Sequence, residues 1–99
     1  MIPYLTVDEI KQLVTNNKKL LIANNMVYDI TNYYTKHPGG NCILQKTIQL
    51  DSRSNRLIVD DCSIDFNFHS KNGKNIWKNL AVGTTKKYTI WQKFLTLLF

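Results

Sequence analysis

The sequence predicts a single small domain that combines α-helices with short β-strands. A capped helix is expected near the N-terminus, a pair of apolar strands follows it, and further helical segments occupy the second half. With 99 residues the chain has the size of one domain with a modest core. We expect the domain to span residues 1–85 and an amphipathic tail to span residues 86–99.

The first elements follow from local sequence patterns. The Thr6 hydroxyl can accept a hydrogen bond from the Glu9 amide while the Glu9 carboxylate reaches back, which is a capping box. Apolar residues at positions 7, 10, 13 and 14 form one face of a helix that ends at Asn16-Asn17. Apolar runs over residues 19–23 and 26–30 flank Asn24-Asn25, which tolerate positive φ, so they predict a hairpin. Tyr4-Leu5 is a candidate for a further short strand.

The middle of the chain predicts shorter elements. Thr31 is expected to cap a short helical segment that ends at His37, because the residue before a proline is disfavoured in the helical region. Asn41 is expected to cap a helix that runs to about residue 49. Residues 51–56 predict a polar loop, and residues 57–59 predict either a short strand or a buried loop.

The last part of the chain predicts two more helices. Asp60, Asp61 and Ser63 offer a cap, and Asn72 is expected to open a helix whose apolar positions are 76, 77 and 80. Residues 81–83 close this element. Apolar residues at positions 91, 94, 95 and 98 then predict an amphipathic helix in the tail.

Composition narrows the function classes. The N-terminus lacks the basic start and apolar run of a signal peptide, and no apolar run approaches the roughly 20 residues that span a bilayer. Cys42 and Cys62 stand apart without a CxxC motif, so we expect two reduced thiols and exclude covalent c-type haem attachment. The net charge is +6, and residues 66–99 carry six lysines and no acid, which suits an acidic partner, an anionic surface or a merely solvated face.

His37 and His69 are the candidate ligating residues. His37 precedes Pro38-Gly39-Gly40, where proline restricts the backbone and the glycines permit close approach. Zinc held with Cys42 and Cys62 is a rival, but structural zinc sites pair ligands about two to five residues apart, and here only His37 and Cys42 meet that spacing. Haem ligated on both faces fits better, because the chain supplies enough apolar side chains for a flat slot.

Four stretches carry a family resemblance: Val27–Thr31, His37–Gly40, His69-Ser70 and Leu80–Gly83. Together they resemble the cytochrome b5 family over about residues 4–85. The resemblance implies an α+β fold in which a small mixed sheet supports helical pairs that form a haem crevice. It implies non-covalent haem b, with its iron held by His37 and His69. Related steroid-binding proteins lack this histidine pair, which argues against that branch.

The resemblance also assigns the surroundings of the haem. Pro38 and Gly39 would belong to the ligand turn, and Ser70 would bind a propionate. Of Phe66 and Phe68, one is expected to pack on the haem. The other expected contacts are Ile22, Ala23, Ile30, Tyr33, Ile43, Leu44, Ile76 and Leu80.

Two closed axial positions favour one-electron transfer over oxygen activation, so we expect an electron carrier and not an enzyme. The resemblance implies a flavoprotein donor such as a cytochrome b5 reductase, and a haem-containing or di-iron acceptor enzyme such as a lipid desaturase or hydroxylase. A haem sensor or carrier without a redox partner is the alternative. Nucleic-acid binding is a further rival, although no binding motif supports it. The expected location is cytoplasmic, with peripheral membrane contact through the tail as a second option.

Three features depart from the family pattern. The 32-residue separation of the histidines exceeds the usual spacing, and the extra length falls within residues 51–63. The chain is basic whereas many family members present an acidic rim, which predicts weaker use of the usual docking surface and an acidic partner. The tail of 12 residues from Tyr88 is too short to span a membrane. We expect it to pack on the domain, with an interfacial membrane helix or self-association as alternatives.

Overall fold

The computed structural model describes residues 2–37 and 40–86, and of residues 40–42 it describes only the backbone. Its main sheet is antiparallel, with β2 (Met26–Asp29) between β1 (Leu20–Ala23) and β5 (Ala81–Thr84). Tyr4 adds an isolated parallel bridge to Thr84, where a short strand was considered. The helix expected in the tail lies outside the described residues.

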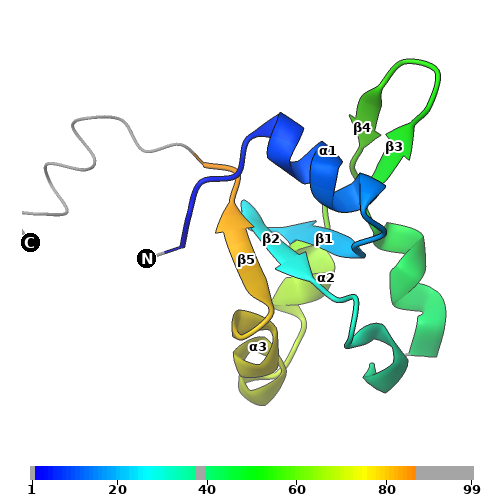
Figure 1. Cartoon of the computed structure of the whole chain (residues 1–99). Coiled ribbons are helices and arrows are strands. Elements are labelled where there is room, and N and C mark those ends of the chain that lie inside the picture. The colour runs from blue at the N-terminus through cyan, green and yellow to red at the C-terminus, as the bar shows by residue number, and fades with distance from the viewer. Residues whose placement is uncertain (1, 38–39, 87–99) are drawn as a thin grey trace, which may run out of the picture.

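Helix α1 (Val7–Thr15) covers one face of this sheet (Figure 1). The predicted capping box is confirmed, because Thr6 Oγ1 accepts from the Glu9 amide and Glu9 Oε1 accepts from the Thr6 amide, each at 3.1 Å. Ile10 is buried, but Val7 is 59% exposed and does not join the apolar face. The helix ends at Asn16, and Asn17 has a φ of 65°.

The predicted hairpin between β1 and β2 is confirmed. Asn24 and Asn25 have φ values of 51° and 63°, the positive pair that a tight hairpin turn requires. Thr31 does not cap the following segment as predicted. Its hydroxyl instead accepts from the Lys19 amide at 2.9 Å and donates to the Asp29 carboxylate, so it fastens the open end of this hairpin.

Two short 3₁₀ helices follow. η1 (Tyr34–Lys36) ends at His37, whose backbone is extended with φ −67° and ψ 129°, as its place before a proline predicts. η2 (Gly40–Lys46) is shorter than the helix predicted to residue 49. The prediction was wrong at that end because Gln49 begins strand β3 (Gln49–Asp51).

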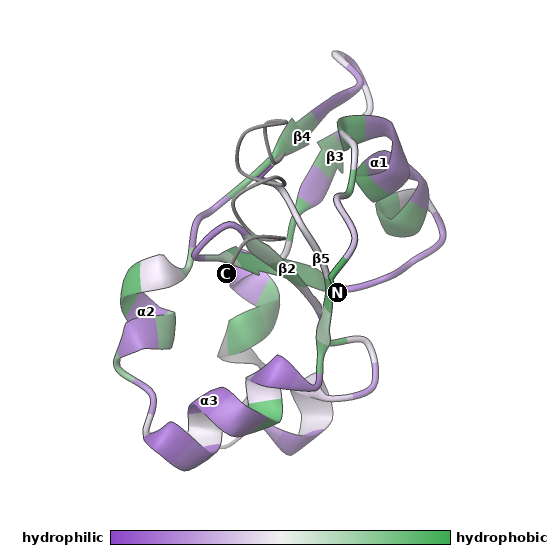
Figure 2. Cartoon of the chain, turned by 90° about the vertical axis from the view of Figure 1, so that its left-hand side faces the viewer, coloured by the Kyte–Doolittle hydropathy of each residue, from purple (hydrophilic) through white to green (hydrophobic). Residues whose placement is uncertain are grey.

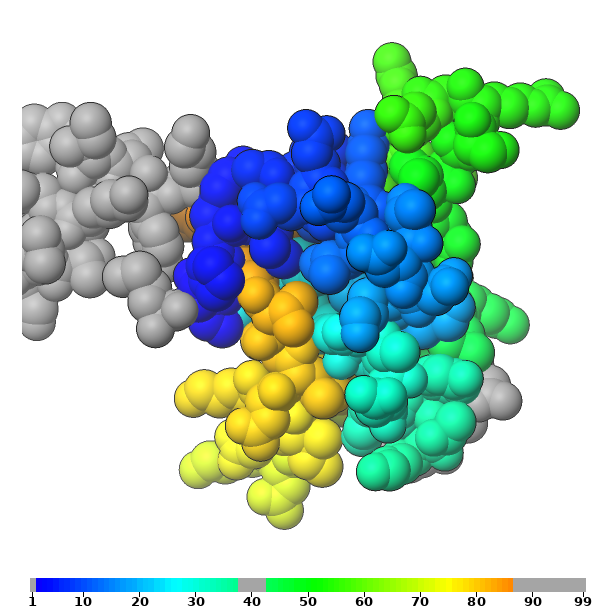
Figure 3. Space-filling model, viewed as in Figure 1, coloured from blue at the N-terminus to red at the C-terminus, as the bar shows by residue number. Residues whose placement is uncertain are grey.

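Strands β3 and β4 (Arg56–Ile58) form a second hairpin that projects from the body of the molecule (Figure 3). The predicted polar loop over residues 51–56 is therefore wrong at both ends, and only the turn between the strands is a loop. The strand alternative for residues 57–59 is confirmed, but burial is not, since Ile58 is 57% and Val59 47% exposed.

Helices α2 (Ser63–Asn67) and α3 (Lys71–Lys78) lie on the face of the main sheet opposite α1 (Figure 1). Asp61 accepts from the Ser63 amide at 2.8 Å just before α2, but the N-cap is Cys62, which makes no side-chain cap hydrogen bond, so the expected cap is not formed at the N-cap position. The predicted start of α3 at Asn72 is wrong. Ser70 is the N-cap and accepts from the Gly73 amide at 3.1 Å. Within the described residues, no helix is long and apolar enough to cross a membrane.

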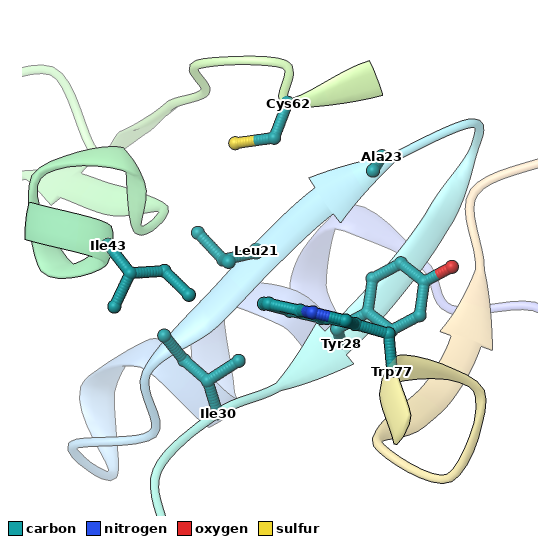
Figure 4. Packing of buried hydrophobic residues seen from close by; sticks show 7 residues of the cluster. All are labelled: Leu21, Ala23, Tyr28, Ile30, Ile43, Cys62 and Trp77. Carbon is teal, nitrogen blue, oxygen red and sulfur yellow. The ribbon is translucent and has the colours of Figure 1, made fainter. Parts of the chain in front are cut away.

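The sheet separates two hydrophobic cores. We call the one beneath α1 the base core; its buried members are Ile10, Leu20, Val27 and Ile48. We call the other the cavity-side core; its buried members are Leu21, Ala23, Tyr28, Ile30, Ile43, Cys62 and Trp77 (Figure 4). Successive residues of a strand point to opposite faces, so β1 sends Leu20 to one core and Leu21 to the other.

Candidate functional site

A cavity of about 350 Å³ lies on the cavity-side face of the main sheet. This volume falls within the range of about 300–1,000 Å³ that is usual for small-molecule sites. Its lining is mostly apolar or aromatic, with both histidines included. The lining residues are Leu21, Ala23, Tyr28, His37, Ile43, Gln45, Lys46, Cys62, Asp65, Phe66, His69 and Trp77.

The structure brings the two predicted ligands together. The ring centroids of His37 and His69 are 6.4 Å apart, although the residues belong to separate parts of the chain. Two metal–imidazole bonds of about 2 Å and two ring half-widths of about 1 Å span roughly 6 Å. The spacing therefore fits one metal ion held between the two rings.

Local backbone contacts orient His69. Its Nδ1 lies 3.0 Å from the Asp65 carbonyl oxygen and 3.3 Å from that of Phe66, both one turn earlier in α2. A carbonyl can only accept, so Nδ1 carries the proton and Nε2 keeps its lone pair. This is how a neutral imidazole is prepared for a metal.

His37 is positioned differently. Its ring lies edge-on to Tyr33, with a centroid distance of 6.2 Å, and its backbone direction is set by the turn before Pro38. Its Nδ1 is buried, and among the described residues it has no hydrogen-bond partner. The residues present thus fit a bis-histidine haem in ligand spacing, in the tautomer of His69 and in the apolar character of the walls.

Several other expected haem contacts lie at or near the cavity. Ala23, Ile43 and Phe66 line it directly. Ile30 is fully buried in the core behind it, and Tyr33 packs against that core and against His37. Leu44 and Leu80 are partly buried against the same core without lining the cavity.

The structure does not bring four of the expected contacts to the cavity. Ile22 packs against the base core on the other face of β1. Phe68 is 85% and Ile76 48% exposed. The Ser70 hydroxyl is engaged as the cap of α3. Pro38 and Gly39 lie outside the described residues.

Sequence reasoning missed Leu21, Tyr28 and Trp77 as lining residues. The period-2 alternation of β1 and β2 groups Leu21 with Ala23, and Tyr28 with Ile30, so the signal was present for the first two. Trp77 was assigned only to an apolar helix face. Gln45, Lys46, Cys62 and Asp65 were also missed as lining residues, and nothing in their sequence pattern marks them.

Cys62 is a buried free thiol in the wall of the cavity. Burial raises its pKa above the usual value, and its Sγ donates to the Asp60 carbonyl oxygen at 3.3 Å. Among the described residues, no three histidine, cysteine or acidic side chains converge to hold a metal ion. Zinc coordination that includes Cys62 is therefore not supported within this part of the chain.

Comparison with known proteins agrees with this geometry. The family model described as "Cytochrome b5-like Heme/Steroid binding domain" matches residues 6–86. A cytochrome b5 of Oryctolagus cuniculus is 28% identical over 82 residues, which cover 83% of this chain and 55% of the relative. The chain thus spans about half the length of that curated relative.

A solved structure, cytochrome b5 of Ostreococcus tauri virus 2, shares the fold with a TM-score of 0.55 and 24% sequence identity. The match covers 84% of this chain and 96% of the viral chain. The predicted α+β fold of the cytochrome b5 type is therefore confirmed. The chain belongs to the cytochrome b5-like haem/steroid-binding family, and the cofactor of its cytochrome b5 domain is non-covalent haem b with its iron.

Proposed function

We propose that this protein is an electron carrier whose haem b is ligated by His37 and His69. The observation that carries the proposal is the 6.4 Å spacing of the two imidazoles across an apolar cavity. Bound haem supplies a one-electron iron(III)/iron(II) couple. The two imidazoles would occupy both axial positions, which favours electron transfer over oxygen chemistry and makes the protein a carrier, not an enzyme.

Absorption spectra of the purified protein with haem test this ligation. The oxidised and reduced wild type should be six-coordinate and low-spin. His37→Ala and His69→Ala should each become high-spin, because each removes one axial nitrogen. Gln12→Ala, on the exposed side of α1, is the control and should keep the wild-type spectrum. A low-spin spectrum in either histidine variant would overturn the ligand assignment.

A basic helix face supports an acidic redox partner. Lys71, Lys74 and Lys78 follow one another at spacings of three and four, so they share one side of α3. The same helix contributes Trp77 to the cavity wall, and most of its residues are hydrophilic (Figure 2). Such a positive stripe attracts a negatively charged protein surface near the haem.

The proposed donor is a flavoprotein of the cytochrome b5 reductase class, and the proposed acceptor is a haem or di-iron enzyme such as a lipid desaturase or hydroxylase. Stopped-flow reduction by a purified reductase tests the donor. A rate that stays near zero at saturating reductase would favour the alternative, a haem sensor or carrier without a redox partner. The proposed location is cytoplasmic, and co-sedimentation with anionic vesicles tests peripheral membrane contact through residues 86–99.

A further inference from the structure

The two proposed haem ligands, His37 and His69, do not explain why Trp77 is buried between them and the sheet. It is the only buried residue of α3, with 4% of its surface exposed. Figure 4 shows its indole extending from α3 across Tyr28 toward Leu21 and Ile43. Its ring also meets those of Tyr33, Phe66 and both histidines edge-on, at centroid distances of 5.7–6.5 Å.

The distances to the histidines define where the indole lies. Its centroid is 6.5 Å from His37 and 5.9 Å from His69, and the two imidazoles are 6.4 Å apart. A triangle with these sides has a median of about 5.3 Å from the indole to the midpoint of the imidazoles. Because the indole is nearly equidistant from both rings, it lies close to the plane midway between them. That is the plane of a macrocycle ligated on both faces.

A porphyrin cannot share this space with the indole. With metal–nitrogen bonds of about 2 Å and ring bonds of about 1.4 Å, its outer ring carbons lie roughly 4 Å from the iron. Non-bonded carbon atoms need about 3.5–4.0 Å between them. An indole centred about 5.3 Å from the iron position in the same plane violates that separation.

We propose that the Trp77 indole and haem compete for the same slot, so that haem binding through His37 and His69 requires Trp77 to leave it. This inference rests on the proposed bis-histidine ligation. Trp77 then lowers the haem affinity of this protein and slows loading, because only the fraction of molecules with the indole displaced can accept haem. The residue sets how readily the carrier is loaded.

The neighbouring residue offers a replacement for the indole. Ile76 is 48% exposed on α3, immediately before Trp77. A rotation of α3 by about 100°, the angle between successive helical residues, would exchange Trp77 for Ile76 at the cavity. The slot would then keep an apolar wall while the indole moves toward solvent.

Haem-binding kinetics of Trp77 variants form the first arm of the test. Association is measured by stopped flow, and dissociation by haem transfer to apomyoglobin. Trp77→Ser should raise the haem affinity at least tenfold, and Trp77→Phe, which keeps more of the packing, should give a smaller gain in the same direction. Val7→Ser, on the exposed side of α1, is the control and should match the wild type. Unchanged or weaker haem binding in both Trp77 variants overturns the proposal.

The second arm follows the indole itself. Trp91→Phe leaves Trp77 as the sole tryptophan, so 5-fluorotryptophan gives a single ¹⁹F signal. A soluble gadolinium chelate should leave that signal sharp without haem. It should broaden the signal in the reduced, low-spin haem protein, whose iron is diamagnetic. A signal that stays protected with haem bound overturns the displacement.

The absorption spectrum distinguishes failure of the proposed haem ligation from failure of the competition between Trp77 and haem. If the wild type and both Trp77 variants all fail to give a low-spin haem spectrum, the proposed function fails and this inference falls with it. If the wild type is low-spin but its indole stays protected, only the competition is wrong. A low-spin spectrum in Trp77→Phe that the wild type lacks supports the competition directly.

Discussion

The two faces of the three-stranded sheet are packed for different purposes. The base core is aliphatic and closed, with Ile10, Leu20, Val27 and Ile48 buried beneath α1. The cavity-side core contains Tyr28, Trp77 and the Cys62 thiol, and it surrounds a cavity beside both histidines. A closed aliphatic core gains the full packing energy of its side chains, whereas a cavity leaves lining atoms without partners. The base face therefore supports the fold, and the other face holds the site.

The largest expected effect is on the base face. Leu20 is fully buried, so Leu20→Ala should lower the free energy of unfolding by about 2–5 kcal/mol. Urea denaturation followed by circular dichroism measures this change. The folded fraction should keep the low-spin haem spectrum, because Leu20 faces away from the cavity. Val7→Ala is the control, and loss of haem binding by folded Leu20→Ala protein would contradict the separation of the two faces.

A second substitution tests how tightly the base face is packed. Gly83 in β5 has no room for a side chain, since an added Cβ would overlap the Leu5 side chain and lie 3.0 Å from the Pro3 carbonyl oxygen. Gly83→Ala should therefore cost about 1–3 kcal/mol of stability through overpacking. Thermal unfolding of Gly83→Ala and of the wild type measures this loss of stability. Gly73→Ala on α3 is the comparison, because its nearest contacts are 3.3 Å and both belong to the single side chain of His69. A larger loss in Gly73→Ala than in Gly83→Ala would show that the base face is not the tighter one.

Local chemistry allowed much of this fold to be predicted. The Thr6–Glu9 capping box, the Asn24-Asn25 turn and the helix end before Pro38 depend on neighbouring residues, and the structure confirms each of them. Thr31 does not cap the next helical segment as predicted, because its hydroxyl forms hydrogen bonds with Lys19 and Asp29. Only the assembled hairpin brings both of these residues close to it. Strand β3 was missed because it has only three residues, of which Leu50 alone is apolar, so the sequence shows no extended apolar alternation there. Strand β4 agrees with the strand alternative for residues 57–59.

The walls of the cavity were predicted less completely than the meeting of the two histidines. The histidines were found through a motif, and the structure places their rings within ligating distance of one centre. Prediction of the residues in the cavity wall depended on knowing which face of β1 lies against the cavity. Alternation groups Leu21 with Ala23 and separates both from Ile22, but because both faces of the sheet are buried it does not by itself show which group lines the cavity. For Trp77, the orientation of α3 decides whether Ile76 or the indole points inward, and it is set by tertiary packing.

The reactivity of Cys62 gives a smaller test on the cavity side. Burial raises the pKa of its thiol, so at pH 8 less thiolate is present than for a free cysteine. In a Cys42→Ser background, iodoacetamide should label the folded protein more slowly than the urea-unfolded protein, because burial lowers the thiolate fraction of Cys62 and shields its sulfur. Because Cys62 lines the cavity, haem should slow the labelling further. Equal labelling rates with and without haem would place the bound haem elsewhere.

The smallest expected effect concerns the start of α2, the helix whose carbonyls hold His69. Asp61 accepts from the Ser63 hydroxyl and amide, and these hydrogen bonds hold the pKa of its carboxyl below the ordinary value of 3.8. A depressed folded-state pKa stabilises the fold at pH values above the unfolded-state pKa, and this stability is lost as the pH falls through the folded-state pKa.

Asp61→Ala should therefore lower the free energy of unfolding at pH 7. The loss should be smaller than the about 1 kcal/mol that removal of a typical helix cap costs, because the carboxylate is exposed. The stability difference from the wild type should shrink as the pH falls below 3.8, and urea titrations at pH 7 and pH 3 measure it. An equal difference at both pH values would show that the charge of Asp61 does not support α2.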